Sequence, residues 1–306
     1  MNLILLKHSE IQSASSTLSS SQTENQQLIV HLTSKDDRAK HIANHLNKKS
    51  GETVSVGIIG GSKGKAIVQH QNGGGIRLEI QPDTLFIPSD EPEITLILAV
   101  PFPMRIKALW PVISSFSAVT RIVIVKGQLS NPEFNATKNL LPEVYTSLIE
   151  KGMMQGGRTR EVKVDVCVSD DDTVSRQLLD KLGLLCRTDD NNNVHDGIAR
   201  VFLDCGDETT TPSPARDVVL EQCGKIATAA PPSAIIAVGP ERGWTGEEAA
   251  LFVNECGFQS ATLGNSILRV DTAVIASLGI VSAALDECHR ERIRGGSHAK
   301  RQRNSE

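Results

Sequence analysis

The stretch SAIIAVGPERGWT, residues 233–245, runs from an apolar segment into a glycine, a proline and a pair of charged residues. A continuous apolar segment of this kind indicates a strand of a parallel sheet that is buried on both faces. Gly239 lets a ligand approach the backbone closely, and Pro240 fixes the direction in which the chain leaves the strand. Thr245 is a natural helix N-cap, with Glu248 at the capping-box position. The stretch therefore predicts a strand, a ligand-accessible loop and a helix.

A second stretch, SATLGNSILRVDTA at residues 260–273, has the same arrangement. Gly264 follows a short predicted strand, and Asp271 or Thr272 is suited to cap a final helix over 272–287. Ligands on open α/β sheets bind at the carboxyl ends of the strands. Because both loops follow strands, we predict that together they wall one small-molecule pocket.

Apolar strands alternate with helices through residues 94–287. The predicted strands are 94–100, 121–125, 162–168, 199–203, 233–238 and 260–263, and the predicted helices are 105–116, 136–152, 174–182, 217–227, 245–256 and 272–287. Such alternation is typical of an α/β domain whose parallel sheet is covered on both faces.

The first ninety residues have a different pattern, with short strands separated by glycine turns. Strands are predicted at 1–6, 28–32, 52–59, 65–70 and 76–80, and a helix that Ser34 caps at 34–46. Turns at 60–64 and 72–75 favour a small β-barrel. Residues 13–27 are predicted to form a polar surface loop, and the proline-rich, acidic segment 82–92 a linker.

Composition supports two folded domains and excludes some partners. The chain has 306 residues, 39% of them hydrophobic and 22% charged, which is ordinary for globular proteins. No apolar run is long enough to span a membrane, so no membrane partner is expected. With a net charge of −4, RNA binding would need a local basic patch. The segment 289–303, with six Lys or Arg against the single acid Glu291, is such a candidate, or else a solvated terminus.

The two loops lack the residues of a self-sufficient catalyst. They contain no Ser-His-Asp set, no paired carboxylates at a cleft and no dinucleotide-binding glycine pattern. The six cysteines of the chain have no C-x-x-C spacing, which argues against a metal site and favours reduced thiols. Reactivity is therefore expected to come from a bound cofactor.

Several motifs in order along the chain resemble the ribosomal RNA small subunit methyltransferase E family of SPOUT methyltransferases. They are MNLILL (1–6), LTSKDDRAKHI (32–42), GETVSVG (51–57), QGGRTR (155–160), GPERGWT (239–245) and LGNSILRVDTA (263–273). The resemblance implies a PUA-like RNA-binding barrel over 1–90 and a SPOUT domain with a deep trefoil knot over 91–290. It further implies a homodimer that uses S-adenosyl-L-methionine to methylate N3 of a uridine in small-subunit ribosomal RNA. The basic composition of the C-terminus predicts a flexible tail over 291–306. A cytoplasmic location is expected, with an organelle left open.

The same resemblance assigns roles to individual residues. The cofactor pocket would be lined by Val238, Gly239, Pro240, Glu241, Gly243, Leu263, Gly264, Ile267, Leu268 and Ala273. Arg158, Arg160 and Arg242 would contact RNA, and Arg269 and Glu241 would be catalytic.

Uracil N3 carries a proton at neutral pH, so the anion that attacks the methyl group needs a positive neighbour. Arg269 suits that role because arginine cannot act as a base, whereas Glu241 or Asp271 could accept the proton. Structural alternatives remain: an Arg269–Asp271 ion pair, Glu241 as an acceptor for loop amides, Trp244 as a packing residue, and Arg158 and Arg160 on a solvated face.

Two departures from the family pattern stand out. Many members have GPEGGF where this chain has Arg242 and Trp244, and the family's K-x-x-E-L-G stretch is replaced here by residues 112–117. Two other functions therefore remain open. One is methylation of another RNA or base position, and the other is a non-catalytic role in ribosome assembly.

Overall fold

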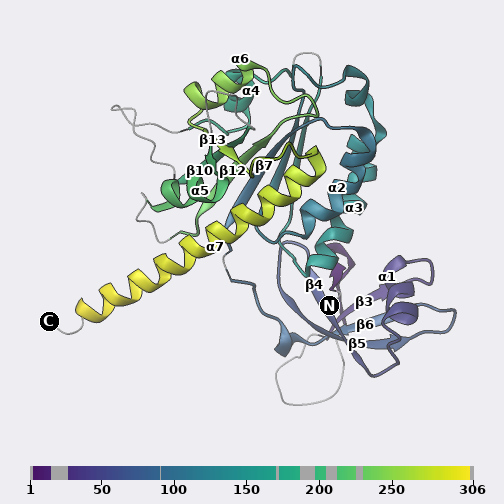
Figure 1. Ribbon diagram of the computed structural model, residues 1–306. Coiled ribbons are helices and arrows are strands. Elements are labelled where there is room, and N and C mark those ends of the chain that lie inside the picture. Colours follow the sequence, from purple (N-terminus) through teal and green to yellow (C-terminus); the bar gives the residue numbers. More distant parts are fainter. Residues whose placement is uncertain are drawn as a thin grey trace. The chain divides into compact units, whose positions relative to one another are not determined.

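The computed structural model describes residues 3–14, 27–89, 91–169, 172–186, 197–204, 212–224 and 230–303. Contacts divide the chain into two units, Met1–Ser89 with Glu150–Glu161, and Asp90–Ile149 with Val162–Glu306 (Figure 1). The sequence assigned residues 150–161 to the second domain, whereas their contacts group them with the first unit.

The first unit contains a curled six-stranded sheet in the order β1-β4-β5-β6-β3-β2 (Figure 1). Its strands are β1 (Ile4–Leu6), β2 (Gln12–Ala14), β3 (Gln27–Leu32), β4 (Thr53–Ile58), β5 (Lys63–His70) and β6 (Ile76–Ile80). β1 pairs with β4 in parallel, and the other pairs are antiparallel. Alternate residues of β5 and β6 point inward onto a buried core that includes Val68 and Leu78.

Two local predictions in the first unit were wrong. Asp36, rather than Ser34, caps α1 (Asp37–Lys40), because the Asp36 carboxylate accepts a hydrogen bond from the Arg38 amide at 2.8 Å. The helix continues as a π-helical turn over His41–His45. The start of the predicted loop 13–27 is instead strand β2, which pairs with β3, and residues 15–26 lie outside the described part of the chain.

The second unit contains a seven-stranded, all-parallel sheet in the order β11-β13-β10-β12-β7-β8-β9. Its strands are β7 (Glu93–Ala99), β8 (Val119–Val125), β9 (Lys163–Cys167), β10 (Ile198–Leu203), β11 (Ser213–Pro214), β12 (Ser233–Val238) and β13 (Gln259–Thr262). Its helices are α2 (Pro103–Ser115), α3 (Pro142–Gly156, which ends in the first unit), α4 (Arg176–Lys181), α5 (Ala215–Gly224), α6 (Gly246–Ala250) and α7 (Val270–Arg303). The prediction of an α/β fold with a parallel sheet is confirmed.

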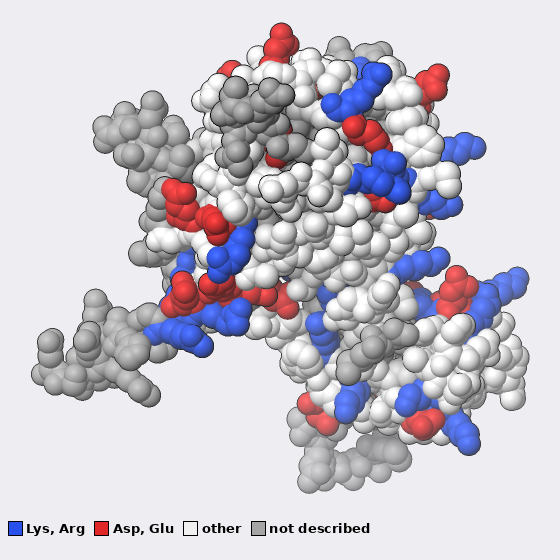
Figure 2. Space-filling model, viewed as in Figure 1, with Lys and Arg blue, Asp and Glu red and all other residues white. Residues whose placement is uncertain are grey.

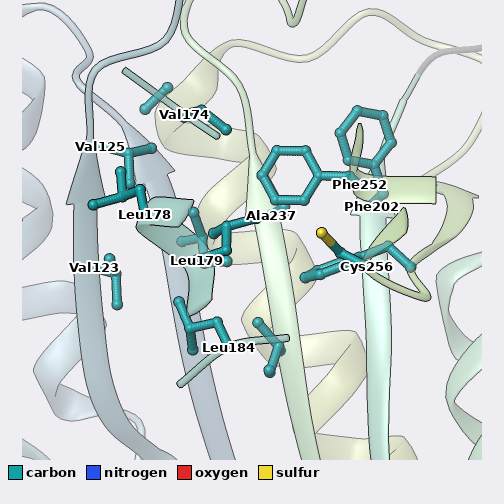
Figure 3. Packing of buried hydrophobic residues seen from close by; sticks show 14 residues of the cluster. Val123, Val125, Val174, Leu178, Leu179, Leu184, Phe202, Ala237, Phe252 and Cys256 are labelled. Carbon is teal, nitrogen blue, oxygen red and sulfur yellow. The ribbon is translucent and has the colours of Figure 1, made fainter. Parts of the chain in front are cut away.

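Apolar side chains on the two faces of this sheet pack against different helices. On one face, Val123, Ala237 and Phe202 point toward Leu178 and Leu179 of α4 and toward Phe252, which follows α6 (Figure 3). On the other face, α7 packs on β12 and contacts α2 and α5.

Helix α7 differs from the prediction at both ends. It begins at Val270, before either predicted cap, and continues to Arg303 instead of ending at Glu287 (Figure 1). The Arg292 side chain donates hydrogen bonds to the carbonyl oxygens of Ala230 and Cys223, each at 3.0 Å. These contacts anchor α7 well beyond the predicted end.

Candidate functional site

The two glycine loops meet at one cavity of about 490 Å³ in the second unit. It lies at the carboxyl ends of β10, β12 and β13, because the loops that follow these parallel strands open on the same edge of the sheet. All ten residues that the sequence assigned to the cofactor pocket line this cavity: Val238, Gly239, Pro240, Glu241, Gly243, Leu263, Gly264, Ile267, Leu268 and Ala273. Their assignment to a particular ligand stays a prediction.

The first loop is shaped by glycine and by an aromatic side chain. A Cβ atom on Gly239 would lie 3.1 Å from Trp244 Nε1, so a larger residue would press on the indole ring. Trp244 packs on Phe252 and Phe202, with ring centroids 5.2 and 6.2 Å apart. Gly243 has a φ of 75°, a conformation that favours glycine. Trp244 is therefore a packing residue of the cavity wall. This agrees with the structural alternative inferred from the sequence for Trp244.

Glu241 fastens the first loop to helix α2. Its Oε1 atom accepts hydrogen bonds from the Phe102 amide at 3.0 Å and from Arg105 Nη1 at 2.9 Å. Sequence reasoning missed Arg105, because 136 positions separate it from Glu241 and no motif links the two. The geometry supports the structural alternative, in which Glu241 is an acceptor that holds the loop.

The second loop presents its backbone to the cavity. Thr262 Oγ1 donates to the Gly264 carbonyl at 2.8 Å and accepts from the Gly264 amide at 3.2 Å, while Gly264 has a φ of 125°. The amides of Ile267 and Leu268 donate to no acceptor within the described residues, and the Ile267 residue is 88% exposed. Polar edges of a ligand could therefore bind to this backbone.

Arg269 lies beside the cavity, where it forms an ion pair. Its Nη2 atom is 3.1 Å from Asp271 Oδ2, and its side chain is 66% exposed. Asp271 Oδ1 is buried and accepts no hydrogen bond from a described residue. The structure therefore contains the predicted ion pair and also leaves the guanidinium accessible to a substrate.

The cavity rim has a second exposed cation, Arg242, which has no ion-pair partner among the residues described. Asp204, which directly follows β10, is a cavity residue that sequence reasoning missed, because it belongs to no motif. Acidic and basic side chains are interspersed on the face shown in Figure 2. No broad basic surface is seen among the described residues of this face.

The QGGRTR motif lies in the first unit, where it packs against the turn after β4. The Gly60 amide donates to the Thr159 carbonyl at 2.7 Å, and Thr159 Oγ1 donates to the Gly61 carbonyl at 2.8 Å. A Cβ atom on Gly57 would lie 2.5 Å from Thr159 Cγ2, so glycine is needed for this contact. Arg158 is only 2% exposed and donates to the Arg160 carbonyl, which points to a structural role for Arg158.

Within the described residues, no three His, Cys, Asp or Glu side chains are grouped so that they could hold a metal ion. The described helices also include none with the length and apolarity needed to cross a bilayer. The cavity is lined by backbone groups, by apolar and charged side chains, and by the hydroxyl residues Thr245, Thr262 and Ser266.

The fold and the cavity define an α/β protein with a small-ligand pocket at the strand ends of a parallel sheet. Residues 89–282 match the family model of the RNA methyltransferase domain, and the chain therefore belongs to that family. A ribosomal RNA small subunit methyltransferase E of Treponema pallidum (strain Nichols) is 26% identical over 286 residues, which cover 90% of this chain and 94% of that protein. The resemblance inferred from the motifs is confirmed.

Solved structures share the fold over nearly the whole chain. A ribosomal RNA small subunit methyltransferase E from Neisseria gonorrhoeae, bound to S-adenosyl methionine, has a TM-score of 0.59 at 20% identity and covers 92% of this chain and 97% of its own. A putative methyltransferase of Legionella pneumophila, in complex with the same cofactor, has a TM-score of 0.57 at 18% identity. The match covers 93% of this chain and 98% of that protein.

Proposed function

We propose that this protein uses S-adenosylmethionine to methylate N3 of a uridine in small-subunit ribosomal RNA. The observation that carries the proposal is the meeting of the two motif loops at one cavity in a chain of the RNA methyltransferase domain family. Two of the relatives described above are named ribosomal RNA small subunit methyltransferase E, and one of these two is bound to S-adenosyl methionine.

The cavity fits S-adenosylmethionine in size and chemistry. Its volume of about 490 Å³ lies within the range of cofactor sites. Gly239 leaves room for the Trp244 ring in the cavity wall, and the amides of Ile267 and Leu268 offer hydrogen bonds to a heteroaromatic edge. The residues proposed to hold the cofactor are the ten lining residues already given. When bound, the cofactor supplies an activated methyl group on a sulfonium, so the protein's task is alignment.

The rim residues are proposed to prepare the nucleophile. Uracil N3 loses its proton and forms a bond to the methyl carbon as the carbon–sulfur bond breaks, and S-adenosylhomocysteine leaves. Arg269 stabilises the negative charge of the deprotonated base, because its guanidinium is exposed next to the cavity. Asp271 is the stronger candidate to accept the proton, because Glu241 Oε1 already accepts two hydrogen bonds.

RNA contact is proposed for Arg242 at the rim and Arg160 in the first unit, while the burial of Arg158 favours a supporting role.

The proposal includes the PUA-like barrel, the trefoil knot and the homodimer that the resemblance implies. Phe102, Met104 and Ile275 are exposed apolar residues of the second unit that could be covered by a second copy. Light scattering that gave a monomeric mass would contradict the dimer.

Nucleoside analysis of ribosomal RNA tests the proposal in cells. A strain that lacks the gene should lose one 3-methyluridine from its small-subunit RNA and regain it when the wild-type gene is restored. Unchanged 3-methyluridine would exclude this substrate. Loss of another methylated nucleoside would show a different RNA position, and an unchanged set of nucleosides with no cofactor binding would favour the assembly-factor alternative.

A further inference from the structure

Glu248 is a buried carboxylate that connects two loops of the second unit. The residue is 1% exposed. Its Oε2 atom accepts hydrogen bonds from the Thr245 amide at 2.8 Å and from Thr245 Oγ1 at 3.2 Å. Its Oε1 atom accepts from the Gln128 amide at 2.8 Å. Burial of a carboxylate is costly unless hydrogen bonds satisfy it, and here both oxygens have donors.

Only part of this arrangement follows from helix capping. The bonds to Thr245 complete the capping box of α6, as the sequence predicts. The bond to Gln128 reaches 120 positions along the chain, to the turn that follows β8. A solvent-exposed glutamate would cap the helix equally well, so capping does not explain the burial or the second bond.

The turn after β8 also contacts the first cavity loop. The Ser130 amide donates to the Gly127 carbonyl at 3.0 Å, which closes a β-turn with Gln128 at its second position. A Cβ atom on Gly127 would lie 3.6 Å from Pro240 Cδ and 3.3 Å from Ala99 Cβ. The turn therefore lies against the first loop at Pro240, while Glu248 holds the other end of that loop through Thr245.

We propose that Glu248 is a positioning residue of the cavity, which fixes the first loop against the turn at residues 127–130 before any ligand binds. Glu248 does not itself line the cavity, whereas Pro240 and Thr245 do. A loop that is already ordered binds a ligand without the entropic cost of ordering. The proposal rests on the proposed function, because it takes S-adenosylmethionine as the ligand.

The turn offers a substitution that removes a single hydrogen bond. Proline is favoured at the second position of a β-turn, so Gln128→Pro should preserve the turn while deleting the amide that donates to Glu248. Gln128→Ala removes the same side chain and keeps the amide. Calorimetry with S-adenosylmethionine should show a Kd raised about tenfold for Gln128→Pro, as loss of one hydrogen bond to a charged group implies, and unchanged within about twofold for Gln128→Ala.

Glu248→Gln gives an independent measurement. Glutamine has one oxygen and one NH₂ group, so either the Thr245 amide or the Gln128 amide would face a donor and lose its hydrogen bond. Its matched control is Glu247→Gln, which removes an exposed acid from the same first turn of α6. The KM for the cofactor should rise in Glu248→Gln while kcat at saturating cofactor stays within about twofold, whereas general loss of structure would lower kcat too. Combining Glu248→Gln with Gln128→Pro should add little, because the glutamine oxygen can then accept from the Thr245 amide while its NH₂ group faces position 128, which no longer has a donor.

The outcomes separate this proposal from the proposed function. If the wild-type protein binds no S-adenosylmethionine, the proposed function fails. If the wild type binds it and both Gln128→Pro and Glu248→Gln bind it equally well, the positioning role of Glu248 is overturned.

Discussion

At the residue scale, some charged groups around the cavity are held in structural hydrogen bonds, and others remain exposed to solvent. Glu241 is held by Arg105 and by the Phe102 amide, and Glu248 by Thr245 and Gln128. Arg242 and Arg269 remain exposed at the rim. Acids therefore shape the first loop, while Arg242 and Arg269 offer accessible positive charge to an anionic substrate beside the exposed acid Asp204.

Arg269→Ala should lower kcat by a factor of about 100 or more, in line with the loss of one donor that stabilises a developing anion. The Kd for S-adenosylmethionine should stay within about twofold, because Arg269 is not among the cavity-lining residues. Single-turnover methylation and calorimetry measure the two quantities, with Lys107→Ala as a control at an exposed cation on α2. An equal loss of binding and turnover would assign Arg269 to structure instead.

At the element scale, periodicity and turn residues predicted much of the fold. The bounds of β12, Ser233–Val238, and the capping box of α6 match the prediction, because both depend on local sequence. The contacts of Arg105 with Glu241 and of Gln128 with Glu248 could not be predicted, because they join positions 136 and 120 residues apart. The π-helical turn Leu251–Glu255 and the length of α7 likewise depend on tertiary packing.

An ion-pair cluster around α1 gives the first unit an acid-sensitive contribution to stability. Arg38 contacts Glu10 at 2.6 Å and Asp36 at 2.8 Å. Burial raises the pKa of each carboxyl, but hydrogen bonds and charge from Arg38 outweigh it, so both pKa values are lowered. Because the folded pKa values lie below those of the unfolded chain, this contribution is complete above the ordinary carboxyl range and is lost as the pH falls through the folded values.

Urea unfolding of the first unit should therefore show Arg38→Gln to be destabilised by about 2 kcal/mol at pH 7, with a smaller difference at pH 3. Lys40→Gln is a suitable control, because the ion pair of Lys40 with Asp37 is exposed. A difference between wild type and Arg38→Gln that stayed constant from pH 7 to pH 3 would rule out the carboxylates as its source.

At the scale of the whole molecule, the two units have different proposed roles, cofactor binding in the second and RNA contact in the first. The second unit contains the cavity, and the first contains the QGGRTR segment, which packs against the turn after β4. With a net charge of −4, the chain as a whole does not attract RNA, so affinity must come from individual cations. Arg242 is the cation that departs from the family pattern and lies at the cavity rim.

Arg242→Ala should weaken binding to small-subunit RNA and reduce the slope of log Kd against log salt concentration by about one, as loss of one phosphate contact requires. Filter binding over a series of salt concentrations measures the slope. A slope equal to that of the wild type would remove Arg242 from the RNA interface.

The central claim is methyl transfer from S-adenosylmethionine to uridine N3, and one reconstitution tests it most directly. Small subunits from the deletion strain are incubated with the purified protein and methyl-labelled S-adenosylmethionine, and their RNA is digested to nucleosides for mass spectrometry. We predict label in 3-methyluridine, at no more than one methyl group per subunit, and labelling about a hundredfold slower when Arg269→Ala replaces the wild type. Label in a different nucleoside, or no label despite measured cofactor binding, would contradict the claim.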